Sequence, residues 1–281
     1  MLNQIKTVFF LGLLTGLLLL VGQLIGGTSG LTVAFIIALL MNFFSYWFSD
    51  KIVLFMYRAK SASKKDHFHL YDLLEEVAKK ANMPVPKLYI IPSAQSNAFA
   101  TGRNPKHAVV AVTNGILNLL NDGELKGVLA HEMAHVKNRD ILLSTIAAVI
   151  AGAISYIAFM ARWAAIFGGG RSDQEGSNIL ELLFLAILTP FIATVVRLAM
   201  SRSREYLADS TGARIIKDPD SLANALKKLE ASNKYIPMKM GSEATSHMFI
   251  VNPFSAKSLL SIFSTHPPVE KRVSRLRSMA F

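Results

Sequence analysis

Two histidines four residues apart stand in the stretch His131-Glu132-Met133-Ala134-His135. Positions i and i+4 lie on one face of a helix, so both imidazoles can reach one ion. Glu132 lies one step round the helix, where its carboxylate reaches an attacking water without ligating the ion. The spacing predicts a zinc site with Glu132 as general base and favours zinc-assisted peptide hydrolysis. Two surface histidines on an amphipathic helix are the alternative interpretation.

A catalytic zinc site needs a third protein ligand and one open position. The extended motif with a downstream glycine and third histidine is excluded, because Asn138 and Ile141 occupy those positions. Glu205 and Asp209 are also four residues apart and therefore share a helical face. We expect Glu205 to ligate zinc and Asp209 to accept a hydrogen bond from a ligand imidazole. A solvated acidic pair that balances neighbouring arginines is the alternative.

The composition indicates an integral membrane protein. Of the 281 residues, 52% are hydrophobic and only 17% are charged, which is too apolar for an ordinary soluble domain. Four stretches are long and apolar enough to span a bilayer, at about 7–26, 31–49, 141–160 and 179–200. The first two are read as a helical hairpin around a short Gly-Gly-Thr-Ser-Gly turn. The last two could instead form a buried hairpin that enters the membrane only in part.

Basic residues indicate how the chain is oriented. The net charge is +11, and Lys and Arg gather after the second stretch, before the third and after the fourth. The positive-inside bias therefore predicts residues 50–140 and 201–281 in the cytoplasm. Basic residues of a membrane protein contact anionic lipid, and no aromatic-rich basic motif of the RNA-binding kind appears, so the bilayer rather than nucleic acid is the expected partner. The chain has no cysteine, so any metal site must use His, Asp and Glu.

The position of the candidate ligands relative to the membrane supports their pairing. His131 and His135 precede the third stretch by ten and six residues, and Glu205 follows Val196 by nine. At about 1.5 Å per residue, all three lie about 9–15 Å from the same membrane face. An antiparallel hairpin of the third and fourth stretches would bring them to one height.

Periodicity and turn signals predict the remaining elements. Helices are expected at 66–82, from about 114, at 122–139, after the fourth stretch, at 219–233 and after Pro267-Pro268; strands are expected at 87–91, 97–102 and 108–113. The long 234–258 loop is a candidate lid.

The expected fold is a mainly α integral membrane protein with a cytoplasmic α+β, zincin-like catalytic domain and a small β-sheet. The expected organisation is an N-terminal hairpin at 1–50, catalytic parts at 51–140 and 201–281, and a second hairpin at 141–200.

Several stretches together form a family pattern. They are HEMAH, SREYLADS about 70 residues later, SNAFATGRNPKHAVVAVTNGIL, HVKNRD, FIVNPFS and STHPPVEKRVSRL. Over nearly the whole chain, this pattern resembles the HtpX-type membrane zinc peptidases, relatives of the CAAX prenyl proteases. The resemblance implies that His131, His135 and Glu205 ligate one zinc ion and that Glu132 is catalytic. It also implies endoproteolysis at the cytoplasmic face of the bacterial inner membrane, in quality control of membrane proteins.

Two further residues are candidates for substrate contacts. His266 could donate to the tetrahedral oxyanion, with a structural role beside the two following prolines as the alternative. Asn97 could contact the substrate backbone, since an extended substrate can add to the edge of the 97–102 or the 108–113 strand. A sheet that only supports the zinc helix is the alternative.

Five other ring side chains have a weaker claim to the site or none. Tyr206 has a weaker claim than His266, because its spacing next to Glu205 points it off the zinc face. The remaining histidines have no partner at ligand spacing and are expected at the surface; they are His67, His69, His107 and His247.

The sequence therefore predicts a zinc endopeptidase that cleaves membrane proteins, their cytoplasmic segments or unfolded polypeptides. A CAAX-type prenyl peptidase is one alternative, for which a chain with at most four spans is short. A non-catalytic membrane scaffold with structural zinc is the other. Glu132 counts against the scaffold, because a structural zinc site does not require that carboxylate.

Overall fold

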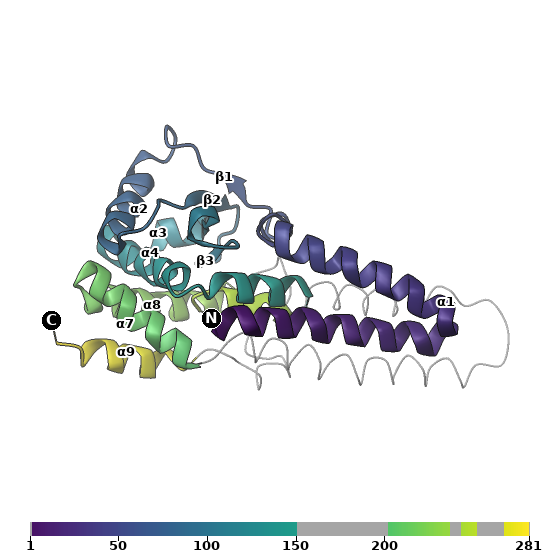
Figure 1. Ribbon diagram of the computed structural model, residues 1–281. Helices are drawn as coiled ribbons and strands as arrows, with labels where there is room; N and C mark the ends of the chain where they lie inside the picture. The colour runs from purple at the N-terminus through teal and green to yellow at the C-terminus, as the bar shows by residue number, and fades with distance from the viewer. Residues whose placement is uncertain (1, 151–201, 237–242, 252–266, 281) are drawn as a thin grey trace.

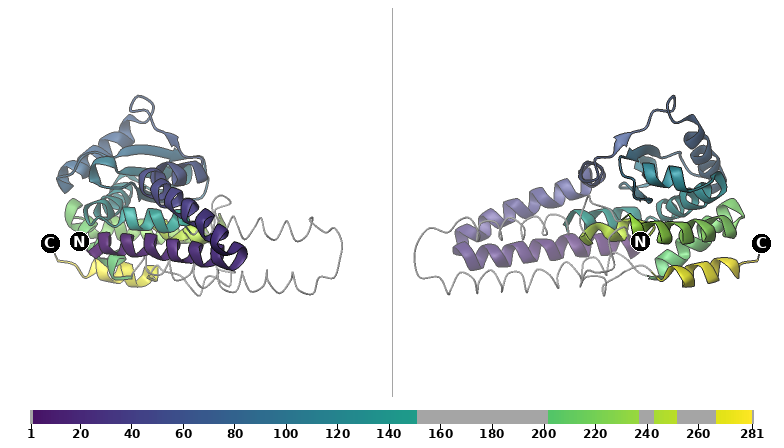
Figure 2. Two further views of the ribbon diagram at one scale, coloured as in Figure 1. Left: turned by 45° about the vertical axis from the view of Figure 1, so that its right-hand side comes forward. Right: turned by 180° about the vertical axis from the view of Figure 1, so that it is seen from behind.

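The computed structural model describes residues 2–150, 202–236, 243–251 and 267–280 (Figure 1). A long helical hairpin projects from one side of a body that combines helices with a small sheet (Figures 1 and 2). The predicted span at 179–200, the second half of the one at 141–160, and His266 lie outside the described residues. Much of the predicted 234–258 loop lies outside them as well.

The hairpin is α1 (Leu2–Met56), whose helical geometry is interrupted at Gly26 and Gly27. Gly27 has a φ of 54°, which glycine adopts without the steric cost that a side chain would bring. The first arm runs outward from the body and the second returns to it (Figure 1). The arms touch closely, since a Cβ at Gly22 would lie 2.5 Å from the carbonyl oxygen of Gly30. The predicted reversal of the chain at 26–30 is confirmed.

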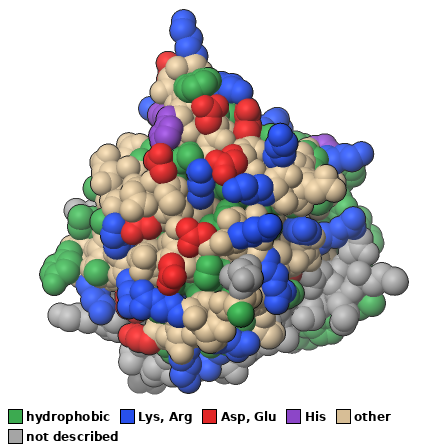
Figure 3. All heavy atoms as spheres, turned by 90° about the vertical axis from the view of Figure 1, so that its left-hand side faces the viewer, with side chains coloured by type: hydrophobic (Ala, Val, Ile, Leu, Met, Phe, Trp, Pro, Cys, Tyr) green, Lys and Arg blue, Asp and Glu red, His purple; other side chains and the backbone are tan. Residues whose placement is uncertain are grey.

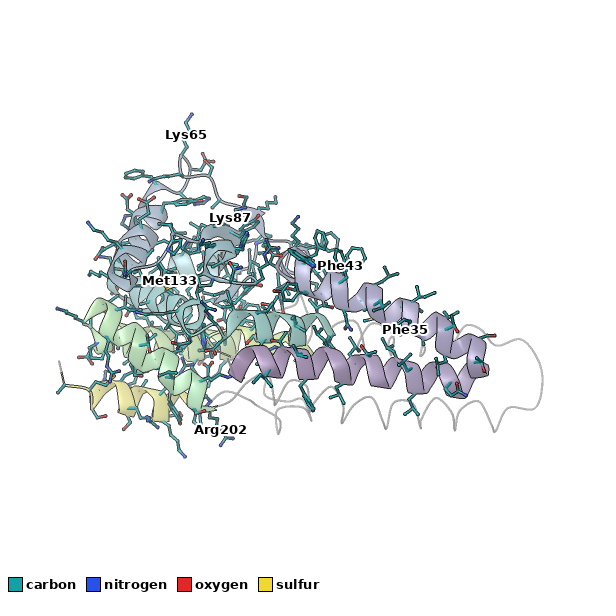
Figure 4. All side chains as sticks on the ribbon, viewed as in Figure 1. Phe35, Phe43, Lys65, Lys87, Met133 and Arg202 are labelled. Atoms are coloured by element: carbon teal, nitrogen blue, oxygen red, sulfur yellow. The ribbon has the colours of Figure 1, made fainter. Side chains whose placement is uncertain are left out.

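The two arms of α1 differ in their surroundings. The first arm packs through Leu14 against the apolar helix over Ile141–Ile150. The second arm, Gly26–Met56, is the one helix in the described ranges that is long and apolar enough to cross a membrane. Its large apolar side chains point outward, with Phe35 47% and Phe43 53% exposed (Figure 4). An apolar face of this size is typical of a surface in contact with lipid.

The sheet has the strand order β1-β2-β4-β3. Its strands are β1 (Lys60–Ser61), β2 (Lys87–Ile91), β3 (Ala98–Thr101) and β4 (Val109–Thr113). β2 and β4 are parallel, and the other two pairs are antiparallel. The three predicted strands are confirmed, whereas β1 was missed because two residues show no periodicity. β4 is paired on both sides, so the alternative that substrate adds to the 108–113 strand is wrong, and β3 is an edge strand.

The helices of the body agree with the predicted ones to within a few residues. They are α2 (Phe68–Ala81), α3 (Asn114–Leu119), α4 (Asp122–Lys137), α7 (Arg202–Ile216), α8 (Pro219–Tyr235) and α9 (Val269–Arg277), with short 3-10 turns at Pro105–His107 and Glu243–Met248. α4 lies at the centre and contacts α2, α7, α8 and β3. Its residues Val128, Leu129 and Met133 are fully buried (Figure 4 labels Met133). The helix that carries the HExxH motif is therefore the central helix of the body.

Local sequence explains where α4 begins. Asn121 accepts a hydrogen bond from the backbone N–H of Glu124, and the Glu124 side chain accepts one from the backbone N–H of Asn121. This capping box satisfies two donors that a helix N-terminus otherwise leaves without partners. Lys228 of α8 adds a 2.8 Å ion pair to Glu124. The start of α4 is thus tied both to its own sequence and to a neighbouring helix.

The face of the body that lies away from the hairpin is strongly charged. Side chains of both signs are interspersed over it (Figure 3). On α2, Glu76 pairs with Lys80 at 2.8 Å and with Lys126 of α4 at 2.5 Å. This surface contrasts with the apolar second arm of α1, as expected if one end of the molecule contacts water and the other lipid.

Candidate metal centre

Three predicted ligands meet where α4 packs against α7. Ligand atoms of His131, His135 and Glu205 all lie within 4.8 Å of one another. Nε2 of His135 lies 3.2 Å from Nε2 of His131 and 3.3 Å from Oε1 of Glu205. The side chains of His131 and Glu205 are 1% exposed, whereas that of His135 is 15% exposed. Two imidazoles and one carboxylate that converge in this way could bind one zinc ion, since this is the donor set of many catalytic zinc sites.

A glycine allows the two helices to approach at this point. Gly212 of α7 faces α4, and a Cβ placed on it would lie only 2.9 Å from the backbone nitrogen of His131. Gly212 follows Glu205 by seven residues and therefore lies on the same helical face. A larger residue would push α7 away and carry Glu205 out of reach of the histidines. Gly212 was not predicted, although its spacing from Glu205 and Asp209 places it on the same helical face.

Asp209 contacts the first imidazole and is itself held by a buried arginine. Its Oδ1 lies 3.0 Å from Nδ1 of His131. Arg272 of α9, which is 1% exposed, donates to both Asp209 oxygens at 2.8 and 2.6 Å and to the carbonyl of Ile250 at 2.7 Å. Burial alone would raise the pKa of Asp209, but the arginine holds that pKa below its usual range. An ionised Asp209 can keep the proton of His131 on Nδ1 and leave Nε2 free for an ion.

A second aspartate takes the corresponding position at the other imidazole. Oδ2 of Asp140 lies 3.3 Å from Nδ1 of His135. The chain turns back after α4 through Arg139, which has a φ of 58°, and this turn places the Asp140 carboxylate beside the helix end. Burial lowers the pKa of His135, but Asp140 and Glu205 together raise it to about 10. A metal ion must therefore displace a proton when it binds His135. Asp140 was not predicted, because the helix break that turns it back was not recognised.

Glu132 is 2% exposed and faces the edge strand of the sheet. The backbone of Ala100 in β3 forms a hydrogen bond with it. Burial raises the pKa of Glu132 to about 7, and the nearby Glu205 charge acts in the same direction. A carboxylate with a pKa near neutrality is well matched to proton transfer at physiological pH.

A short segment lies along the same edge of β3. The N–H of Ile250 donates to the carbonyl of Ala98 at 3.2 Å, and the side-chain amide of Asn97 donates to the carbonyl of Val251 at 2.5 Å. Phe249 and Ile250 also line the pocket that contains the two histidines and both glutamates. Residues 249–251 therefore occupy part of the edge at which an extended peptide would add to β3.

The comparisons with known proteins agree with this site. The sequence model of peptidase family M48 matches residues 64–280. This chain belongs to peptidase family M48. It is 57% identical over 276 residues to a protein named "Protease HtpX homolog" from Desulfatibacillum aliphaticivorans, which covers 98% of this chain and 89% of that protein. A protein of the same name from Pyrococcus furiosus is 53% identical, over 98% of this chain and 96% of its own length. The resemblance to HtpX-type membrane peptidases is thus confirmed.

A solved structure shares the fold of this M48 chain. The crystal structure of S. mikatae Ste24p superposes with a TM-score of 0.53 over 98% of this chain and 65% of that one, at 19% sequence identity. At this level of identity, the likeness shows that the two chains share a fold.

The structure also places the residues that were predicted to lie outside the M48 site. The prediction that His247 is a surface residue is wrong, because it is 1% exposed and lies 3.0 Å from the carbonyl of Ser144 in the site pocket. The 3-10 turn Glu243–Met248 carries it inward, and such a short turn has no periodicity to reveal its buried side. Tyr206 lies outside this pocket with Arg275 4.1 Å above its ring, as expected. Asn97 is fully buried, so its contact with substrate stays a prediction.

Proposed function

We propose that this M48 chain is a zinc-dependent endopeptidase of the bacterial inner membrane, with its active site on the cytoplasmic side. Its substrates would be membrane proteins, their cytoplasmic segments or unfolded polypeptides, cleaved in the quality control of membrane proteins. The observation that carries the proposal is the convergence of His131, His135 and Glu205, with Glu132 beside them in one pocket. The name "Protease HtpX homolog" of the relatives supports the peptidase activity, and the apolar helix Gly26–Met56 supports the membrane location.

In this proposal, His131, His135 and Glu205 hold one zinc ion. When bound, zinc supplies a Lewis acid that polarises the scissile carbonyl and makes an attacking water more acidic. Asp209 and Asp140 orient the two imidazoles through their Nδ1 atoms.

Glu132 transfers the proton. Its carboxylate accepts a proton from the attacking water and returns it to the amine of the leaving peptide. Its burial keeps bulk water away, so the proton stays available for the second transfer. His266 is assigned, as the sequence suggested, to hydrogen bonding with the oxyanion.

The outer edge of β3, part of which residues 249–251 occupy, is the proposed binding site for substrate. The carbonyl of Ala98 faces this edge, as its contact with Ile250 demonstrates, and Ala100 is two residues further along the same strand. An extended peptide that adds here would pass directly over Glu132, to which Ala100 is bonded. Asn97 holds the backbone carbonyl of Val251, and we assign the same contact to a substrate carbonyl once Val251 is displaced.

The proposed membrane arrangement follows the sequence. The hairpin at 1–50 and the second one at 141–200 lie in the bilayer, and the parts at 51–140 and 201–281 form one catalytic body. The packing of α4 against α7 and α8 supports the union of these two parts. The placement of basic residues next to the apolar stretches supports a cytoplasmic body.

A cleavage assay on the full chain in detergent tests this function. Wild-type protein should contain one zinc ion and cleave casein in a chelator-sensitive way. Glu132→Gln should keep its zinc and lose about 10²–10⁴-fold in cleavage rate, because only proton transfer is removed. Zinc-dependent cleavage at the wild-type rate in this variant would refute the general-base role. Wild-type protein that holds zinc but cleaves nothing would instead be the scaffold, and a strict need for a prenylated substrate would indicate a prenyl peptidase.

A further inference from the structure

A groove of about 670 Å³ lies where the second arm of α1 returns to the sheet. One wall comes from the last turns of α1 and carries the aromatic rings of Phe43, Trp47 and Phe48. The other wall comes from the starts of β2 and β4 and from the turn between β3 and β4. Figure 4 labels one residue on each wall, Phe43 and Lys87. The groove is separate from the metal centre and shares none of its residues.

The groove has an excess of positive charge. Among the described residues that line it, four are cations, Lys51, Lys87, Arg103 and Lys106, and one is an acid, Asp50, so these residues carry 4 − 1 = +3. Among the described residues, none of these four cations is within ion-pairing distance of a carboxylate. Like charges gathered without acidic partners create a positive potential that attracts an anion.

The cations and the aromatic rings are interleaved. The guanidinium of Arg103 lies 4.7 Å from the centre of the Trp47 ring, and Nζ of Lys51 lies 5.2 Å from that of Phe48. Phe43 and Trp47 remain 53% and 47% exposed, in the second half of the helix that can cross a membrane. Tryptophan with Lys or Arg at such a position is typical of the boundary between hydrocarbon and lipid headgroups.

The turn that carries two of the cations is preformed. Gly102 has a φ of 126°, which favours glycine, and the side chain of Asn104 accepts a hydrogen bond from the N–H of His107 at 3.1 Å. Nη2 of Arg103 lies 3.1 Å from Nε2 of His107. The backbone of the turn and the guanidinium of Arg103 are therefore held in place, and Lys106 extends from the same fixed turn.

We propose that this groove binds the headgroup of an anionic phospholipid. The phosphate lies among Lys87, Arg103 and Lys106, and the acyl chains follow Phe43 and Trp47 along α1. A volume of this size suits one headgroup. The aromatic side chains on α1 and the cations beside the sheet follow one another in the groove. The acyl chains and the phosphate of a phospholipid follow one another in the same order. The bound lipid would fix the catalytic body to the bilayer surface, and this role does not depend on the proposed peptidase activity.

Lipid quenching of Trp47 tests the site in the full chain. The protein has two tryptophans, and Trp163→Phe leaves Trp47 as the sole reporter beside the groove. The variant is reconstituted in bilayers that contain brominated phosphatidylglycerol or, at the same mole fraction, brominated phosphatidylcholine. We expect phosphatidylglycerol to occupy the site at least about tenfold more tightly, because each of the three cations near an anionic headgroup adds several-fold.

Charge variants separate a defined site from general attraction to anionic lipid. Lys87→Gln, Arg103→Gln and Lys106→Gln together should reduce the preference to about one. The matched control removes three exposed lysines outside the groove, Lys65→Gln, Lys79→Gln and Lys227→Gln, and should keep the preference. Equal quenching by both lipids in the Trp163→Phe protein, or loss of the preference in the control, would overturn the proposal. So would displacement of the lipid by millimolar inorganic phosphate, which would identify a site for free phosphate.

Discussion

The helices α4 and α7 each bring a pair of functional side chains to the metal centre at i,i+4 spacing, yet they are held there differently. α4 begins at its own capping box and carries the histidines and the general base in five consecutive positions. α7 reaches the site through distant residues, since Arg272 of α9 holds Asp209 and Gly212 lets the helix lie against His131. Two ligands therefore depend mainly on local sequence, whereas the third depends on packing between helices. Substitutions at residues that hold α7 in place should therefore weaken zinc binding even when they lie far from the ligands. A substitution at a similar distance on α4 should weaken it less.

The largest effect is expected for the ligand that α7 supplies. Glu205→Ala removes one of three ligands and should weaken zinc binding by more than about 100-fold, since changes outside the ligand set cost 10–100-fold. His135→Ala should weaken zinc binding by a similar factor, which would show that α4 and α7 each supply an essential ligand. Zinc affinity is measured by competition with a chelating dye in detergent. Glu270→Ala, on an exposed site in α9, is the control, and wild-type zinc affinity in Glu205→Ala would exclude Glu205 as a ligand.

The next effect tests the anchor of α7. Arg272→Met leaves Asp209 buried without its cation and should destabilise the zinc-free body by about 3–5 kcal/mol. Adding Asp209→Asn should restore part of this loss, because residue 209 then carries no buried charge that lacks a cation; the 3.6 Å ion pair of Arg272 with Glu205 stays lost. Chemical denaturation in the presence of chelator measures both variants. Arg275→Met, an exposed arginine on the same helix, should change little. Equal stability losses in the two single arginine variants would show that the buried pair has no special role.

A smaller effect is expected where the helices touch. Gly212→Ala places a methyl group 2.9 Å from the His131 backbone nitrogen and should cost about 1–3 kcal/mol through overpacking. Zinc affinity should fall with it, because α7 carries Glu205. Gly16→Ala, in α1, meets no atom within 4 Å and is the matched control. Unchanged zinc affinity in Gly212→Ala would mean that the helices can separate without moving the ligand.

The smallest effect concerns α4 itself. Asn121→Ala removes the N-cap and should cost about 1 kcal/mol of stability. It should leave zinc affinity unchanged, because the histidines lie more than two turns from the cap. Asn118→Ala, an exposed residue of α3, serves as the control in thermal denaturation. A loss of zinc affinity as large as that of Gly212→Ala would remove the distinction between the two helices.

Features set by neighbours along the chain were predictable from the sequence alone. The HExxH spacing, the turn at the start of α4, the reversal at 26–30 and the three longer strands all follow from periodicity, capping and glycine content. Even the third ligand was accessible, because Glu205 and Asp209 share a helical face at a suitable distance from the apolar stretches. The general base and the mostly helical fold with a small sheet follow from the same local rules.

Only the tertiary structure decided which side chains support those residues. Arg272, Asp140 and Gly212 act across helices or through a turn, and His247 is buried by a 3-10 turn too short to show a pattern. The edge position of β3 likewise depends on strand order, which pairs β2 with β4 across a parallel crossover. Hydrophobic periodicity shows which face of a helix or strand is buried, but it does not show which other element packs against that face. Local sequence therefore identifies the candidate ligands and the general base, and long-range packing determines how precisely those side chains are positioned.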